Sequence, residues 1–122
     1  MCRLGPSSPI PEWVLAGPFY SVTRTPQELS IVCPEARLPA GGSGLAVERG
    51  FRAFQVAGPL DFGLTGLLST LLAPLARAAI PVFVLSTFDT DLILVRAEHL
   101  EPAAEALGRV AVVRRDVGSG SA

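Results

Sequence analysis

The 122-residue chain contains no lysine and only one histidine, although it carries ten arginine residues. The absence of lysine excludes Schiff-base chemistry and the phosphate-binding lysine of P-loop proteins. The single histidine, His99, would have to serve every nucleophile, so no Ser/His/Asp or Cys/His set can be assembled. We therefore expect a protein that is not an enzyme and uses no cofactor.

Cysteine is also scarce, because Cys2 and Cys33 are the only two thiols. Two cysteines are too few for a disulfide framework, and their spacing does not match a metal site. The default compartment is then the reducing cytoplasm. Cys33 alternates with Leu29 and Ile31 on one face of a predicted strand, which favours a place in the core over a role as a nucleophile.

The chain lacks an excess of charge and long hydrophobic runs. Its net charge is −1 and only 17% of its residues are charged, so no strong field would attract nucleic acid or anionic lipid. The opening residues MCRLGPSSPIPEW lack the pattern of a signal peptide. The most apolar stretch, 64–85, is interrupted by polar residues and prolines and cannot span a membrane. We expect neither a nucleic acid nor a membrane as partner.

Apolar residues and turn formers are abundant instead. The sequence is 49% hydrophobic and contains 12 glycines and 11 prolines. This composition predicts one compact domain, or two very small ones sharing a core, built from short elements with frequent turns.

The second half of the chain has the clearer pattern. Apolar residues at helical spacing from Leu64 to Ala79 predict an amphipathic helix over 63–79, which Pro74 is expected to kink. The opposite face carries small residues in place of charges, which suggests that a partner or ligand covers it. These residues are Gly66, Ser69, Thr70, Ala73 and Pro74.

The order of elements in this half predicts an α+β fold. Apolar runs bounded by turn formers predict strands, and those over 81–86 and 91–96 are expected to be buried on both faces and to form a hairpin. His99 is expected to cap the following helix in solvent. The complete order is β (51–57), α (63–79), β (81–86), β (91–96), α (98–107) and β (110–115), which is the ferredoxin-like βαββαβ order.

The first half is less regular. Strands are predicted over 19–24 and 28–33, joined by a turn at Thr25-Pro26-Gln27, with proline at its favoured position. A short helix is predicted within 9–15 and a surface loop within 34–45. The pattern is compatible with a shortened βαββ version of the second half.

Three stretches, taken together, carry a resemblance to a known family. They are FYSVTRTP (19–26) with ELSIVCP (28–34), GPLDF (58–62) and STFDTD (86–91). The chain resembles small bacterial proteins built from two ACT-like domains, whose modules also occur in the CASTOR cytosolic arginine sensors of animals. The resemblance implies a degenerate ACT-like module over 1–48, packed side by side with an ACT-like βαββαβ module over 49–116. Residues 117–122 are expected to be a disordered tail.

The resemblance also implies a ligand site between ACT-like modules. The turn after the first strand, the start of the next helix and the Ser-Thr-Phe turn hold the ligand in the sensors. The corresponding residues here are Asp61, Phe62, Gly66, Ser86, Thr87, Phe88 and Asp91. This chain has half as many modules as the sensors, so the interface is expected to lie between the two subunits of a homodimer. Leu64 stands where the arginine sensor has an acidic side chain, which argues against arginine as the ligand.

The same residues have a chemistry that suits an amino acid. The first amides of the predicted helix, at 63–65, could bind a carboxylate, and Gly66 would allow close approach to the backbone. Asp91 could bind the ammonium group and Thr87 could offer its hydroxyl. The alternative is that Asp89 and Asp91 are turn residues and that Asp61 caps the helix.

Two functions therefore remain in competition. The first is a non-catalytic regulatory or sensor protein that binds a small amino acid at an interface between ACT-like modules of a homodimer. The second is a ligand-free dimerisation or protein-interaction module of the same fold.

Overall fold

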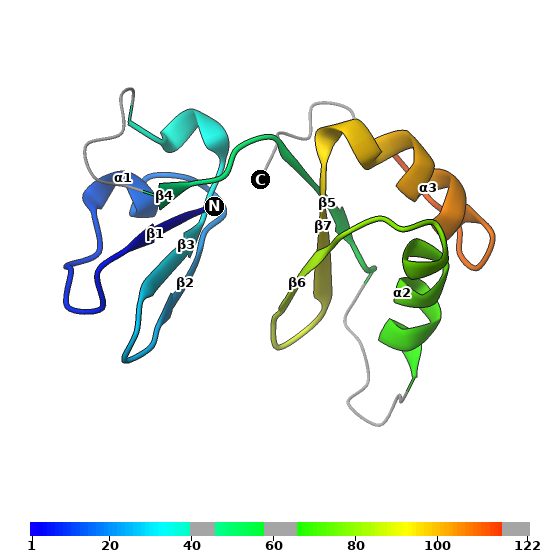
Figure 1. Ribbon diagram of the computed structural model, residues 1–122, viewed down its shortest axis with the longest axis horizontal. Coiled ribbons are helices and arrows are strands. Elements are labelled where there is room, and N and C mark those ends of the chain that lie inside the picture. Colours follow the sequence, from blue (N-terminus) through cyan, green and yellow to red (C-terminus); the bar gives the residue numbers. More distant parts are fainter. Residues whose placement is uncertain (40–45, 58–65, 116–122) are drawn as a thin grey trace. The chain divides into compact units, whose positions relative to one another are not determined.

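The computed structural model describes residues 1–39, 46–57 and 66–115 (Figure 1). The chain divides into two compact units, of which the first spans Met1–Gly50 and the second begins at Phe51. Each unit has its own antiparallel sheet and its own apolar cluster, which confirms the α+β class. No helix in the described part of the chain is long and apolar enough to cross a bilayer.

The N-terminal unit contains a four-stranded sheet with the order β2-β3-β1-β4. Its elements are β1 (Cys2–Leu4), α1 (Glu12–Leu15), β2 (Ser21–Arg24), β3 (Leu29–Val32), the 3-10 turn η1 (Glu35–Arg37) and β4 (Ala46–Val47). The predicted strands at 19–24 and 28–33 and the predicted helix within 9–15 are confirmed in shorter form. β1, β4 and η1 were not predicted. With them the unit follows the full ferredoxin-like order, its two helices reduced to about one turn each.

One face of this sheet forms the core of the unit. The cluster consists of Cys2, Val14, Leu29, Ile31, Cys33 and Leu38, with Trp13 packed against it. Cys33 is fully buried, as the strand alternation predicts. Burial raises the pKa of both thiols, so they remain protonated core residues at neutral pH.

The C-terminal unit contains a three-stranded sheet with the order β5-β7-β6, and helices α2 and α3 lie on one face of it (Figure 1). Its elements are β5 (Phe51–Gln55), α2 (Leu67–Arg77), β6 (Phe83–Ser86), β7 (Asp91–Arg96), the 3-10 turn η2 (Ala97–His99) and α3 (Leu100–Gly108). Strands and helices follow the predicted order as far as α3. The predicted residues 63–65 of the first helix lie outside the described residues, as do 117–122.

The predicted strand at 110–115 is wrong. Residues 109–111 form a turn and a bend, and 112–115 form no strand. The segment is held by side chains instead, because Val113 packs against the core and Arg115 forms an ion pair with Glu101. The sequence favours an extended backbone here, but strand pairing needs a partner as well.

The burial of β6 also differs from the prediction. β6 lies at an edge of the sheet, Phe83 is 44% exposed and Ser86 is exposed, so this strand is not buried on both faces. The central strand β7 is the buried one, through Ile93, Leu94 and Val95.

The apolar stripe of α2 packs as its spacing predicts. Leu71 and Leu75 join Ile93 and Val95 of β7 in one buried cluster. Pro74 is buried as well, although its position in the helical pattern suggested the opposite face. The helix ends where Ala79 adopts a left-handed φ of 59°, and the Ile80 N–H donates to the Leu75 carbonyl over 3.0 Å.

Candidate functional site

The β6–β7 hairpin carries four of the predicted ligand residues. Its turn is closed by the Thr87 N–H, which donates to the Thr90 carbonyl over 2.8 Å. The Thr90 N–H donates in return to the Thr87 hydroxyl over 3.1 Å. Phe88 and Asp89 therefore occupy the tip, where Phe88 is 82% exposed.

Ser86 and Asp91 form a side-chain pair at the base of this turn. They are register partners, and the Ser86 hydroxyl donates to the Asp91 carboxylate over 2.6 Å. Asp91 alternates along β7 with Ile93 and Val95, so its half-buried side chain is on the sheet face that the helices cover. The carboxylate is thus oriented by a neighbour as well as placed by the turn.

Thr90 fastens the hairpin to the segment that follows β5. Its hydroxyl donates to the Val56 carbonyl, and the Val56 N–H donates to the Asp91 carbonyl over 2.9 Å. These bonds join the predicted ligand-binding turn to the backbone that leads toward Asp61 and Phe62. Thr90 could not be identified from the sequence, because a hydrogen bond between residues 34 positions apart leaves no periodic signal.

Gly66 immediately precedes α2 and has a left-handed φ of 79°. A Cβ atom built there would meet no heavy atom of the described residues within 4 Å. None of these residues therefore fills the space beside the Gly66 Cα. Its carbonyl accepts two hydrogen bonds of 2.9 Å from Thr70, one from the N–H and one from the hydroxyl.

The start of α2 and the hairpin turn lie at the same end of the sheet (Figure 1). No hydrogen bond among the described residues joins Gly66 to the hairpin. Asp61, Phe62 and the amides of 63–65 lie outside the described residues. The structure therefore brings Ser86, Thr87 and Asp91 together and sets Phe88 at the exposed tip.

The described residues contain no group of three His, Cys, Asp or Glu side chains that could hold a metal ion. His99 occupies the N-cap position of α3 and is half-buried, but its side chain makes no capping hydrogen bond, so the predicted capping role is wrong.

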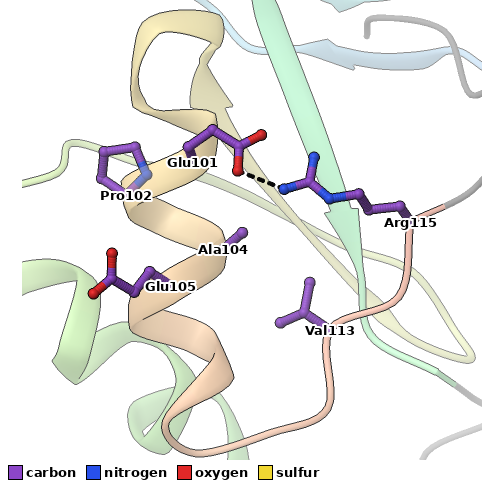
Figure 2. A pocket seen from close by; sticks show the side chains of 6 residues that line it. All are labelled: Glu101, Pro102, Ala104, Glu105, Val113 and Arg115. Carbon is purple, nitrogen blue, oxygen red and sulfur yellow. Dashed lines mark hydrogen bonds and ion pairs between the residues drawn. The ribbon is translucent and has the colours of Figure 1, made fainter.

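A shallow hollow lies beside α3 and contains none of the predicted ligand residues (Figure 2). It is lined by Glu101, Pro102, Ala104, Glu105, Val113 and Arg115. Arg115 donates to the Glu101 carboxylate over 2.5 Å, which lowers the pKa of that carboxyl. Both side chains are more than 60% exposed, so water screens the pair.

Two family models match this chain, one in each part. A model of the ACT domain family matches residues 46–109, and a second model, of an N-terminal domain, matches residues 1–41. A crystal structure of a protein from Agrobacterium tumefaciens is 42% identical and superposes with a TM-score of 0.79, covering 88% of this chain and 78% of that one.

Two curated proteins are also similar in sequence to this chain. The bovine protein named cytosolic arginine sensor for mTORC1 subunit 1 is 31% identical over 108 residues, and the human protein of that name is 30% identical over 108 residues. Each match covers 82% of this chain but only 33% of the relative. The chain thus spans about a third of the length of the curated relatives it matches. We conclude that the chain belongs to the ACT domain family and is related to these arginine sensors.

Proposed function

We propose that this protein is a non-catalytic regulatory protein that binds a small amino acid through its C-terminal unit. The observation that carries the proposal is the Ser86–Asp91 pair, which holds a carboxylate at the end of the sheet where α2 begins. An oriented carboxylate at such a place is suited to an ammonium group.

The other end of the ligand would meet the beginning of the helix. Backbone N–H groups that lack a partner in the first turn of a helix attract a carboxylate, and the helix dipole adds to this attraction. α2 has 11 residues, enough for such an effect. The resemblance adds Asp61, Phe62, Thr87 and Phe88 to the proposed contacts, and the open space beside Gly66 is compatible with a ligand backbone close to the chain.

Leu64 bears on the identity of the ligand. The bovine and human relatives are named as arginine sensors. The resemblance described above implies that this chain has Leu64 where the arginine sensors have an acidic side chain. We therefore propose that the ligand is a small amino acid other than arginine. We also propose that a second copy of the chain supplies the facing ACT-like module, and that the protein works in the cytoplasm.

A thermal-shift screen of the purified protein against the twenty amino acids tests this proposal. A ligand at 100 times its dissociation constant stabilises the native state by about 2.7 kcal/mol. For a unit of roughly 60–100 residues, each kcal/mol raises the melting temperature by about 4–8 °C. Calorimetry of any hit would give the dissociation constant, and a flat panel would refute amino-acid binding.

The role of Asp91 is tested with a matched pair of variants. Asp91→Ala removes the proposed ammonium partner, and loss of a hydrogen bond to a charged group costs about 1.5–3 kcal/mol, or roughly 10- to 150-fold in affinity. Asp89→Ala removes the same charge two residues away, at an exposed position with no hydrogen bond or ion pair to the described residues. Equal affinity losses in both variants would contradict a specific role for Asp91.

A ligand-free interaction module is the second candidate, and exposed side chains favour it. Phe88 is 82% exposed, and the small-residue face of α2, with Gly66, Ser69, Thr70 and Ala73, is exposed as well. Light scattering that shows a stable dimer, together with a flat amino-acid panel, would support this candidate. A monomer at micromolar concentration would count against both functions as stated.

A further inference from the structure

The two units carry the same hairpin turn between their second and third strands. In the N-terminal unit the Thr25 N–H donates to the Glu28 carbonyl over 2.8 Å, and the Glu28 N–H donates to the Thr25 hydroxyl over 3.1 Å. Thr87 and Thr90 make the same two bonds at the same lengths in the C-terminal unit. The turns can therefore be aligned residue by residue.

The strand registers fix which residues correspond. Arg24 pairs with Leu29 across the base of the first turn, as Ser86 pairs with Asp91 across the base of the second. Arg24 thus stands where the C-terminal unit has Ser86. Leu29, which is fully buried, stands where it has the carboxylate of Asp91. The N-terminal unit therefore has no acid for an ammonium group at this place.

Arg24 also bonds to the segment that follows the first strand of its unit. Its guanidinium donates to the Ser8 carbonyl over 2.8 Å and to the Pro6 carbonyl. These carbonyls belong to the connection between β1 and α1, the counterpart of the connection between β5 and α2. The side chain therefore spans the place where a ligand would lie if the N-terminal unit bound one as proposed for the C-terminal unit.

The short helix α1 of the N-terminal unit is a poor binding site for an anion. α1 has only four residues, and Glu12 places a negative charge in its first turn. A helix this short has a weak dipole, and an acidic side chain repels a carboxylate.

We propose that Arg24 closes the N-terminal counterpart of the ligand site, so that each chain binds a single amino acid, in its C-terminal unit. The claim that each chain binds a single amino acid rests on the proposed function. The claim that Arg24 forms a bridge to the Pro6 and Ser8 carbonyls does not, and it can be tested without any ligand.

Amide hydrogen exchange of the full chain tests the bridge. The Ser8 N–H donates to the Gly5 carbonyl over 3.1 Å, within the segment that Arg24 holds. We expect this amide to exchange several-fold faster in Arg24→Ala and Arg24→Gln than in the unsubstituted protein. Arg77→Ala, which removes the same charge from an exposed position on α2, should leave it unchanged. Unchanged exchange in both Arg24 variants would overturn the inference.

NMR spectra of the ¹⁵N-labelled protein with an equimolar mixture of the twenty amino acids test the stoichiometry. We expect shifts at the amides of Gly66 and residues 86–91 and none at the amides within 5–8 and 24–29, where Pro6 and Pro26 have no N–H. Shifts at residues 5–8 and 24–29 in the unsubstituted protein would overturn the inference. If no amide shifts, amino-acid binding and the single-ligand stoichiometry fail together, and the exchange measurement decides on the bridge alone.

Discussion

Substitution of Thr90 should show how much the bond between the β6–β7 hairpin and the segment after β5 stabilises the C-terminal unit. Thr90→Val keeps the size of the side chain and removes the hydroxyl that donates to the Val56 carbonyl. A hydrogen bond contributes about 0.5–1.5 kcal/mol net, and a buried acceptor left without a partner costs about 1–3 kcal/mol. Because this bond is only partly buried, we expect a loss near the lower end, about 1–2 kcal/mol.

The aromatic residues allow each unit to be followed separately. The only tryptophan and the only tyrosine, Trp13 and Tyr20, lie in the N-terminal unit, so intrinsic fluorescence reports that unit. Far-ultraviolet circular dichroism reports mainly the C-terminal unit, because α2 and α3 have 11 and 9 residues while α1 has four. In urea, Thr90→Val should lower the dichroism midpoint while the fluorescence midpoint changes less.

Thr90→Ser is the matched control, because it restores the hydroxyl and loses only a methyl group from a half-buried side chain. We expect it to recover most of the lost stability, since one buried methylene is worth about 0.8 kcal/mol at most. Two results would refute the reasoning. One is a Thr90→Val variant as stable as the unsubstituted protein, and the other is a serine variant as unstable as the valine variant.

Three further substitutions follow from local geometry. Ala79→Gly should stabilise the protein by about 0.5–1 kcal/mol in urea unfolding, because glycine adopts the left-handed conformation without strain but gains entropy when unfolded. Ile93→Ala should destabilise it by about 2–5 kcal/mol, since Ile93 is 1% exposed in the central strand. Arg115→Ala should raise the pKa of Glu101 toward its ordinary value, measured by carboxyl NMR. The ion pair stabilises the fold above the unfolded pKa of Glu101, and this contribution is lost as pH falls through the lowered folded pKa.

Periodic apolar patterns made part of the fold predictable. The spacing of Leu71 and Leu75 indicated the buried stripe of α2, and the run around Ile93 indicated a strand. Both signals depend on many residues of one element. β1 has only three residues and β4 only two, and neither length is enough for an alternating pattern to show.

The sequence did not show which distant segments of the chain pair with one another. The valines at 110, 112 and 113 favour an extended backbone, yet Val112 is 86% exposed and the segment has no strand partner among the described residues. At the hairpin the resemblance implied Ser86 and Asp91, and the chemistry of the residues favoured Asp91 as well. Their hydrogen bond became visible only through the register of β6 and β7.

The two units differ in the length of their helices and in the number of their described strands. The N-terminal unit has four strands and only vestigial helices, whereas the C-terminal unit has two longer helices and three strands among the described residues. A site for a zwitterion needs a helix long enough to attract the carboxylate and an acid to hold the ammonium group. Only the C-terminal unit combines such a helix, α2, with an acid at the base of its hairpin, Asp91. In the N-terminal unit the buried Leu29 occupies the position of Asp91, and Arg24 occupies the position of Ser86. The Arg24 side chain donates to the backbone carbonyl of Ser8 in the same unit. Under the proposed function the turn of the C-terminal unit binds a ligand, whereas in the N-terminal unit Arg24 ties the same turn to its own backbone. Exchange at Ser8 should therefore depend on Arg24 whether or not any amino acid binds.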